Sequence, residues 1–281
     1  MDNRATKTST RFGDMYVVKA DAVIGRSLIE YGEWTQSEIF VLSQLIRPGM
    51  VVVDVGANVG THTLAMAGMV GPKGWVVALE PQPFVFRLLS ANLVMNGCEN
   101  VVAINAGAGK SAGWLDVPNI GYQASGNYGS LELEPFAREL DSPRGGAPVP
   151  LMRLDDIPAA DKASLLKIDA ERMEVPVIEG ALELIGRNRP LLYVENEPAG
   201  ENSERLIRSL MDLGYACFWD IARFFNADNF KRNPRNVFGN IVCVNMVCVP
   251  AEKPHSITNF SQVRDPTDYP TPRRAGARPN P

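Results

Sequence analysis

The stretch Val51-Val52-Val53-Asp54-Val55-Gly56-Ala57-Asn58-Val59-Gly60 joins a run of valines to an acid and a glycine-containing turn. A valine run without polar alternation is typical of a strand that is buried on both faces of a parallel sheet. Residues 61–70 follow with the composition of a helix. Glycines let backbone approach a ligand closely, and the first turn of a helix offers free N–H groups. The stretch therefore predicts a strand–turn–helix unit that binds a nucleotide-like ligand.

The composition of the 281-residue chain is that of a globular protein with 45% hydrophobic residues, enough for a sizeable core. A formal net charge of -4 without a basic run argues against nucleic acid as the main partner. No apolar run approaches the length of a membrane span, and the first residues lack the apolar stretch of a secretory signal. The four cysteines form no Cys-x-x-Cys pair and are expected to be reduced thiols. These features predict a cytoplasmic protein without membrane association.

Further apolar runs alternate with helical patterns after the opening stretch. The predicted strands cover residues 75–79, 101–104, 165–169, 191–194, 216–220 and 241–249. This alternation predicts an α/β fold with a doubly wound sheet and right-handed crossovers. No helix need separate the last two strands, so the last strand is expected to run antiparallel. Such sheets bind ligands at the carboxyl ends of their strands, which directs attention to the residues found there.

Segments outside this alternation are predicted to flank a main domain of residues 49–250. Residues 1–48 are expected to form an N-terminal cap and lid, in which Thr35-Gln36-Ser37-Glu38 has the pattern of a capping box. Residues 113–150, rich in glycine and proline, are predicted to be an inserted loop. Residues 221–240 interleave Phe with Asn, which suits either the lining of a substrate site or plain turns. The Pro-rich tail, residues 251–281, is predicted to be disordered.

The acids at two strand ends select the type of cofactor. Asp54 precedes the turn, where it would repel a pyrophosphate but not a cationic or zwitterionic ligand. S-adenosylmethionine is such a ligand, with an ammonium, a carboxylate and a sulfonium. Glu80 ends the next strand, and an acid there can accept hydrogen bonds from both ribose hydroxyls. The two acids predict an S-adenosylmethionine site in which Asp54 orients the amino end of the cofactor.

Several motifs in this order resemble those of the FkbM-family methyltransferases. They are Val52-Val53-Asp54-Val55-Gly56-Ala57-Asn58-Val59-Gly60-Thr61-His62-Thr63, then Leu79-Glu80-Pro81, then Leu166-Lys167-Ile168-Asp169-Ala170-Glu171. Tyr31-Gly32-Glu33-Trp34 and residues 233–242 resemble the longer bacterial members, and the resemblance extends over residues 24–250. It implies a class I methyltransferase fold (Rossmann-like), a sheet of seven strands with the last one antiparallel. It also implies O-methylation of a sugar or natural product at a hydroxyl group, as in natural product biosynthesis.

The chain departs from the family pattern at two positions. Arg172 stands where the family usually has glycine, and Lys110 stands where it often has an acid. Arg172 could block a bulky acceptor, bind an anionic one, or indicate lost activity. A cofactor-binding protein with impaired or no catalysis is therefore the alternative to an active enzyme. A nucleic-acid methyltransferase is disfavoured by the net charge and by the lack of an Asn-Pro-Pro-Tyr type motif, and a nicotinamide oxidoreductase by the glycine pattern.

The candidate catalytic residues are the polar groups expected on the acceptor side. Asp169 is the first choice for a general base or for positioning the acceptor, with capping of the next helix as the alternative. Glu195 could converge on the same point or hydrogen-bond to nearby backbone. His62 could be a base or a hydrogen-bonded core residue. Asp169, Glu171 and Glu195 would suit Mg²⁺, but no spacing signature requires an ion, so no metal is predicted.

The predicted cofactor contacts gather around the turn and the neighbouring strand ends. They are Trp34, Asp54, Gly56, Ala57, Asn58, Gly60, Thr61, Glu80, Pro81 and Asn105. The expected partner is a small molecule with a hydroxyl group. The sequence leaves the oligomeric state open, with a homodimer as one option.

Overall fold

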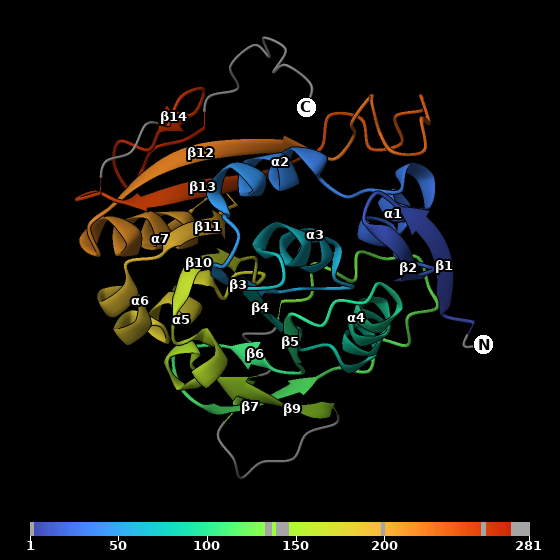
Figure 1. The fold of residues 1–281 in the computed structure, drawn as a ribbon, viewed down its shortest axis with the longest axis horizontal. Helices are drawn as coiled ribbons and strands as arrows, with labels where there is room; N and C mark the ends of the chain where they lie inside the picture. Colours follow the sequence, from blue (N-terminus) through green and yellow to red (C-terminus); the bar gives the residue numbers. More distant parts are fainter. Residues whose placement is uncertain (1–2, 133–136, 139–145, 198–199, 254–256, 271–281) are drawn as a thin grey trace.

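The computed structural model describes residues 3–132, 137–138, 146–197, 200–253 and 257–270. A central sheet of eight strands has the order β14-β12-β13-β11-β10-β3-β4-β5 (Figure 1). In chain order these strands are β3 (Val51–Val55), β4 (Trp75–Leu79), β5 (Val101–Ile104), β10 (Ala163–Ile168), β11 (Leu191–Glu195), β12 (Tyr215–Arg223), β13 (Val242–Pro250) and β14 (Ser261–Gln262).

The strand directions confirm the predicted doubly wound sheet. Strands β3, β4, β5, β10 and β11 pair in parallel. The seventh predicted strand, β13, is inserted between β11 and β12 and runs antiparallel to both. It enters the sheet directly after β12 without a crossover helix, which is the reason for its reversed direction.

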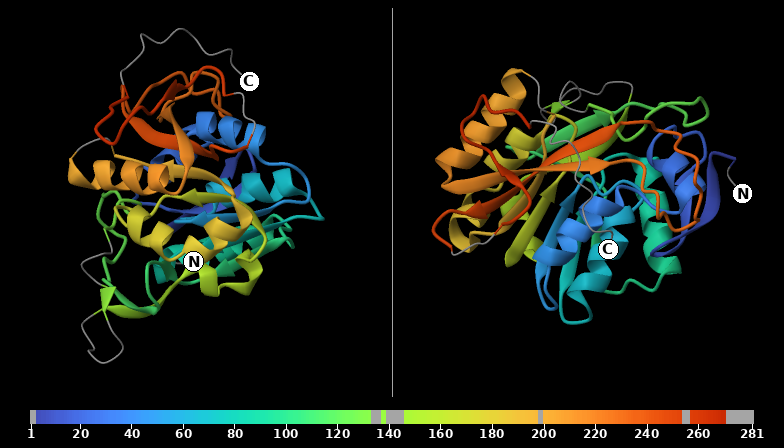
Figure 2. Two further views of the ribbon diagram at one scale, coloured as in Figure 1. Left: turned by 90° about the vertical axis from the view of Figure 1, so that its left-hand side faces the viewer. Right: turned by 90° about the horizontal axis from the view of Figure 1, so that it is seen from above.

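Helices cover both faces of the sheet, as the two views in Figure 2 show. One face packs against α2 (Gln36–Leu45), α3 (Thr61–Val70) and α4 (Pro83–Met95). The other face packs against α5 (Glu174–Glu179), α6 (Leu182–Asn188) and α7 (Glu201–Asp212). Alternate residues of β3 serve the two cores, with Val52 on the α3 side and Val53 and Val55 on the α5–α7 side. The buried valine run therefore forms a central strand, as predicted.

The N-terminal cap is a β-hairpin followed by two helices. The hairpin pairs β1 (Ala5–Thr10) with β2 (Gly13–Val18), and α1 (Ile24–Tyr31) leads to α2. The predicted capping box is wrong in its detail. Thr35 does precede α2, but its backbone is left-handed (φ 39°) and its side chain makes no capping bond. Glu38 points away from the helix end into the protein, where Asn245 donates a hydrogen bond to it.

The predicted insertion, residues 113–150, contributes most of a small second sheet with the order β6-β9-β7-β8. Its strands are β6 (Gly107–Ala108), β7 (Gly113–Val117), β8 (Ala137–Arg138) and β9 (Ala147–Met152), and the 3-10 turns η2 (Leu154–Asp156) and η3 (Pro158–Ala160) follow. Leu115 and Val149 form the buried core of this sheet. The insertion is thus an organised element over much of its length.

The prediction of a disordered tail is wrong for its first part. Strand β14 pairs with Phe218 and Trp219 of β12, and the neighbouring Val263 is only 2% exposed. The edge of β12 offers unpaired backbone groups, and Val263 gains a buried site beside it. Residues 271–281 lie outside the described residues. Among the helices of the described residues, none combines the length and apolar character needed to cross a membrane.

Candidate cofactor and methyl-acceptor site

A cavity of about 350 Å³ lies where the parallel strands end. This volume falls in the range of small-molecule sites, and the location is the one expected for a doubly wound sheet. The cap, the strand ends, the insertion and β13 all contribute to its wall. Among the predicted site residues, the cavity is lined by Trp34, Gly56, Asn58, Glu80, Pro81, Asp169 and Glu195.

Gly56 forms a part of the wall that only glycine can form. Its backbone has φ 78°, a conformation that other residues rarely adopt. A Cβ atom at this position would lie 1.8 Å from the carbonyl oxygen of Asp169. The bare backbone of the turn therefore lets β3 and β10 come together beside the cavity and leaves room for a ligand.

Glu80 presents a carboxylate to the cavity from the end of β4. It is 3% exposed, and its two oxygens accept hydrogen bonds from the backbone N–H groups of Asn58 (2.9 Å) and Gln82 (2.8 Å). Each oxygen keeps a second lone pair for a ligand hydroxyl. Burial raises the pKa of Glu80 to about 7 despite these two hydrogen bonds. These two remaining acceptor positions fit the ribose of S-adenosylmethionine, whose two hydroxyls can donate to them.

The structure places Asp54 outside the residues that line the cavity, and its predicted contact with the amino end of the cofactor stays a prediction. Alternation along β3 directs its side chain to the α3 face, and it is fully buried. Thr63 donates a 2.6 Å hydrogen bond to one carboxylate oxygen, and Lys167 Nζ lies 3.3 Å from the other. Asp54 is therefore part of a buried charge network that supports the turn.

Four other predicted cofactor contacts also lie outside the cavity lining, namely Ala57, Gly60, Thr61 and Asn105. The Asn105 amide donates to the carbonyl oxygens of Glu80 and Pro81, so it fixes the turn after β4. Gly60, with φ 94°, begins α3. Thr61 holds a buried hydroxyl with no hydrogen-bond partner among the described residues. These residues shape the cofactor half of the site from behind its surface.

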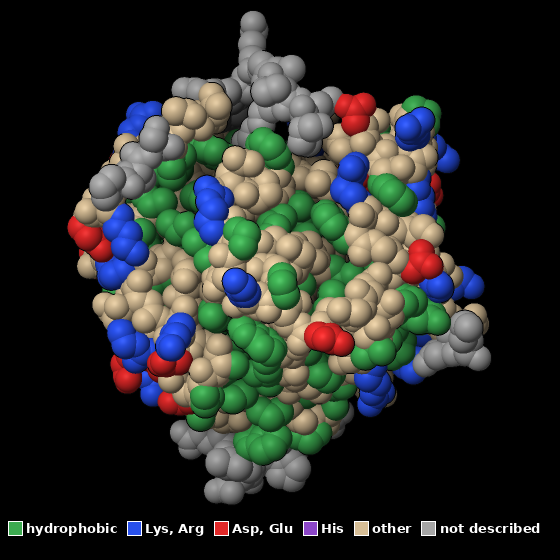
Figure 3. All heavy atoms as spheres, viewed as in Figure 1, with side chains coloured by type: hydrophobic (Ala, Val, Ile, Leu, Met, Phe, Trp, Pro, Cys, Tyr) green, Lys and Arg blue, Asp and Glu red, His purple; other side chains and the backbone are tan. Residues whose placement is uncertain are grey.

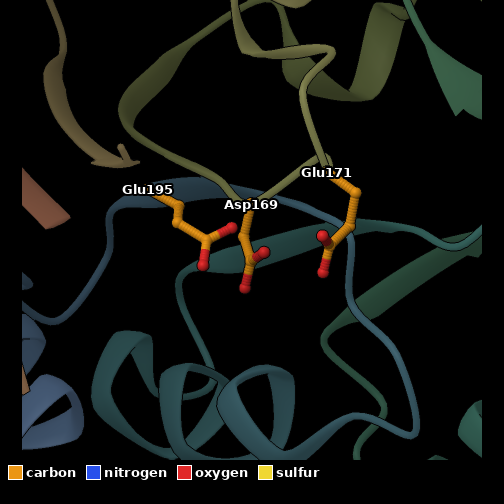
Figure 4. A group of neighbouring side chains, drawn as sticks. All are labelled: Asp169, Glu171 and Glu195. Atoms are coloured by element: carbon orange, nitrogen blue, oxygen red, sulfur yellow. The ribbon is translucent and has the colours of Figure 1, made fainter. Parts of the chain in front are cut away.

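Three carboxylates lie together at the part of the cavity formed by the ends of β10 and β11, which is called the acceptor half below, while the part around Glu80 is called the cofactor half. Oxygens of Asp169, Glu171 and Glu195 lie within 4.8 Å of one another, and Figure 4 shows the three side chains converging from two strand ends and the following loop. Three carboxylates at this spacing could also ligate a divalent cation. The expectation that the site uses no metal stays a prediction.

Lys167 sets the charge of this cluster. It is 2% exposed, and its Nζ lies 3.3 Å from a carboxylate oxygen of Asp54 and of Asp169. Burial alone would raise the pKa of Asp169, but the charge of Lys167 and a hydrogen bond from Glu195 lower it. Burial and the charge of Asp169 raise the pKa of Glu195 well above its usual range. The two neighbouring carboxyl groups are thus shifted in opposite directions, and Asp169 is the one whose ionised form is favoured.

His62 does not line the cavity, although the sequence placed it among the catalytic candidates. Its Nε2 lies 3.1 Å from a carboxylate oxygen of Glu38, without aligned hydrogen-bond geometry. Of these two residues, Glu38 lines the cavity. Its other carboxylate oxygen accepts a 3.1 Å hydrogen bond from Asn245 Nδ2. His62 thus lies behind a pocket-facing acid.

Sequence reasoning missed Lys167, Glu38 and Asn245 as site residues. For Lys167 a signal was present, since a lysine in an otherwise apolar strand needs a buried counter-charge. For Glu38, the capping-box pattern of residues 35–38 favours a role at the start of α2, which considers only neighbours in the sequence. Asn245 carries no local signal, because its role depends on the antiparallel insertion of β13.

The sheet order with one reversed strand, the glycine turn and the ribose-fitting acid together define a class I S-adenosylmethionine-dependent methyltransferase. The family model of the methyltransferase FkbM domain matches residues 54–217, more than half of the chain. The chain belongs to this family, and its cofactor is S-adenosylmethionine.

Several known proteins are similar to this chain over part of its length. Methyltransferase sdnD of Sordaria araneosa is 29% identical over 157 residues, which are 47% of this chain and 60% of that protein. Methyltransferase 1 of Beauveria bassiana is 28% identical over 145 residues, 46% of this chain and 57% of that protein. The chain thus spans about 60% of the length of these relatives. The crystal structure of an FkbM methyltransferase from Methylobacillus flagellatus is 15% identical, with a TM-score of 0.47, covering 75% of this chain and 50% of that one.

Binding of S-adenosylhomocysteine, the demethylated cofactor, is expected to strengthen as the pH rises from about 6 to about 8. Glu80, with a pKa of about 7, is mostly protonated at the lower pH and mostly ionised at the higher one. Only the ionised form accepts hydrogen bonds from both ribose hydroxyls, and its population rises about tenfold over this interval. Calorimetry should therefore give a dissociation constant that falls about tenfold. The variant Glu80→Gln should bind weakly without this rise, and a parental pH profile in that variant would contradict the assignment.

Proposed function

We propose that this methyltransferase transfers the methyl group to a hydroxyl oxygen of a small molecule. The observation that carries the proposal is the pair of carboxylates of Asp169 and Glu195, which line the cavity with oxygens within 4.8 Å of each other, and Lys167 Nζ lies 3.3 Å from Asp169. The sheet order supports a cavity with two parts, one for the cofactor and one for the acceptor. Glu80 ends β4 on one side of β3, and Asp169 and Glu195 end β10 and β11 on the other. A ribose held at Glu80 leaves the carboxylate pair for the acceptor.

The chemistry of methyl transfer suits this pair. S-adenosylmethionine supplies a methyl group on a sulfonium, which is attacked in line by the acceptor. A hydroxyl is a weak nucleophile, so a carboxylate that accepts its proton assists the attack. Asp169 can accept the hydrogen bond of the acceptor hydroxyl and take the proton as the oxygen–carbon bond forms. The charge of Lys167, 3.3 Å away, lowers the pKa of Asp169 and so favours its ionised form, and the neighbouring Glu195 acts in the same direction.

The remaining wall of the acceptor half combines aromatic and polar groups. Trp34 of the cap packs edge-on against Phe224, with ring centroids 4.5 Å apart, and both line the cavity beside Glu38 and Asn245. Apolar faces with a few hydrogen-bonding groups suit a sugar-like or natural-product acceptor.

The Asn residues of the 221–240 loop take the structural role that the sequence left as the alternative. The amide of Asn226 donates to Glu33 in the cap, and that of Asn229 donates to the carbonyl oxygen of Asn233. The first bond fastens the loop to the cap and the second ties the loop to itself, and Phe224 is the residue of the loop that lines the cavity.

The position of Arg172 supports an active enzyme over one with blocked catalysis. Its side chain is half exposed and does not line the cavity that holds Glu80 and Asp169. The guanidinium lies 3.3 Å from Glu132 and 3.8 Å from Glu197, on the rim of a neighbouring hollow. From this position the Arg172 side chain does not obstruct the part of the cavity that holds Asp169 and Glu195.

Replacing Arg172 by glycine is expected to stabilise the protein slightly. The backbone at Arg172 has φ 74°, which costs a residue with a Cβ roughly 1–2 kcal/mol. Glycine removes this cost but loses roughly 0.5–1 kcal/mol of chain entropy, and the exposed ion pairs contribute little. Denaturant unfolding should therefore give a gain of about 0.5 kcal/mol for Arg172→Gly. Arg172→Ala, which keeps the Cβ, should show no gain, and equal stabilities of both variants would contradict the explanation.

The proposed function is tested with methyl-labelled S-adenosylmethionine and panels of sugars, aliphatic alcohols and phenols. Matched amines and carboxylic acids serve as competing classes. The expected product is a methyl ether, which resists mild base, whereas a methyl ester is cleaved by it. Label found only on nitrogen or in base-labile esters would overturn the proposal. An RNA arm tests the nucleic-acid methyltransferase that the net charge disfavours. The face in Figure 3 shows its basic side chains scattered instead of forming one continuous field, so we expect no RNA methylation.

A further inference from the structure

Residues 120–131 of the insertion run along the cofactor half of the cavity. Figure 1 shows this green segment leaving the small sheet and passing beside α4 to the N-terminal hairpin. Asn127, Gly129, Ser130 and Leu131 line the same cavity as Glu80, although they lie outside the parallel sheet. We propose that residues 120–131 form a strap that closes over the adenosine part of the cofactor and controls its release.

The strap is fastened to the rim of the site by Gln82. This residue follows Glu80 by two positions, lines the cavity and is 5% exposed. Its Nε2 donates a 2.8 Å hydrogen bond to the carbonyl oxygen of Tyr128, and its Oε1 accepts a 2.9 Å hydrogen bond from the Tyr122 hydroxyl. One side chain thus uses both ends of its amide to hold two points of the strap.

Aromatic packing reinforces this attachment. The rings of Tyr122 and Tyr128 have centroids 5.0 Å apart, and the ring of Tyr122 lies 4.8 Å from that of Phe84 in the first turn of α4. Both tyrosines are buried. Neither of them lines the cavity, so their contribution is to the closed position of the strap and not to direct contact with the cofactor.

A second attachment joins the strap to the cap. The N–H of Ala22 donates to the carbonyl oxygen of Gly126 (2.8 Å), and the N–H of Gly126 donates to that of Ala20 (3.3 Å). Asp21 forms a parallel bridge with Gly126, and its buried carboxylate accepts the N–H groups of Val23 and Gly25. The strap therefore lies between two elements that both reach the cavity.

The sheet order decides which part of the cofactor the strap covers. Glu80 at the end of β4 fits the ribose, and the ends of β10 and β11 hold the acceptor carboxylates on one side of it. The adenine must then extend to the opposite side, toward β5, where Gln82 and the strap lie. An opening strap would release the cofactor without exposing the Asp169 side of the cavity. The inference depends on the cofactor alone and not on the identity of the acceptor.

The test measures dissociation of S-adenosylhomocysteine by stopped-flow displacement. Tyr122→Phe removes one hydrogen bond of the strap and no cavity-lining group, so the dissociation rate should rise roughly fivefold. Gln82→Leu removes both bonds and should raise it by about tenfold or more. Gln123→Leu, an exposed position on the same strap, is the matched control and should behave like the parent. Parental dissociation rates in both Tyr122→Phe and Gln82→Leu would overturn the proposal.

Hydrogen exchange gives a second readout that does not depend on turnover. The amides of Ala22 and Gly126 should exchange more slowly when S-adenosylhomocysteine is added to the parent protein. In Tyr122→Phe this protection should be reduced while that of the β3 amides is unchanged, which also confirms that the variant is folded. Exchange at Ala22 and Gly126 that does not respond to the cofactor would show a fixed wall and reject the strap.

Discussion

Lys167→Met is expected to lower the free energy of unfolding by about 3–5 kcal/mol. The lysine ammonium is enclosed in the sheet, 3.3 Å from oxygens of both Asp54 and Asp169. The register of β10 and β3 places Lys167 directly beside Asp54, so the two charges meet across neighbouring strands. Methionine fills a similar volume but leaves both acids without their counter-charge. Denaturant unfolding of parent and variant measures the loss.

A second substitution separates lost charge from lost packing. Adding Asp54→Asn to Lys167→Met removes one of the uncompensated acids, so the double variant should be more stable than Lys167→Met alone. Lys110→Met is the matched control, because this exposed lysine pairs with Glu179 at the surface and should change stability by less than about 0.5 kcal/mol. A loss in Lys167→Met no larger than in the control would refute the buried network.

Asp169→Asn is expected to lower turnover by about 10²–10⁴-fold while the affinity for S-adenosylhomocysteine stays within about twofold. The amide keeps the shape of the side chain but cannot accept the proton of the acceptor hydroxyl. Glu80 and Gly56, which define the cofactor half, are unaltered. Turnover is measured with the acceptor found in the hydroxyl panel, and affinity is measured by calorimetry.

Two further variants test whether the loss of turnover is specific to the carboxylate of Asp169. Glu195→Gln keeps a hydrogen-bond donor for Asp169, so it should cost far less turnover than Asp169→Asn. Glu183→Gln, an exposed acid of α6 that pairs with Arg153 and does not line the cavity, should leave both quantities unchanged. Equal losses of turnover and cofactor affinity in Asp169→Asn would identify Asp169 as a structural residue and not as the base.

The parallel sheet and its glycine turn could be predicted because their signals are local. The valine run of residues 51–55 can be satisfied only by burial on both faces, and the acid at Glu80 follows from its place at the next strand end. The reversed direction of β13 was foreseen from a missing crossover. For Asp54, the place in β3 could be predicted but the partners could not, because strand alternation turns the side chain toward Thr63 and Lys167.

Contacts between distant segments could not be predicted in this way. Thr35 and Glu38 have the pattern of a helix cap, yet in the folded protein the acid meets His62 and Asn245, since these groups offer contacts in a buried site. Val263 in the Pro-rich tail is buried because the edge of β12 is available to it. Each outcome depends on which surface another part of the chain presents.

The sequence by itself determined the class of fold, the cofactor and the positions of Gly56, Glu80 and Asp169 at strand ends, because period, turn chemistry and chain order are local properties. Only the tertiary structure decided how the charges are paired, with Lys167 between Asp54 and Asp169 and Glu38 in front of His62. A buried charge must find its counter-charge wherever packing brings one, and sequence distance carries no information about that choice.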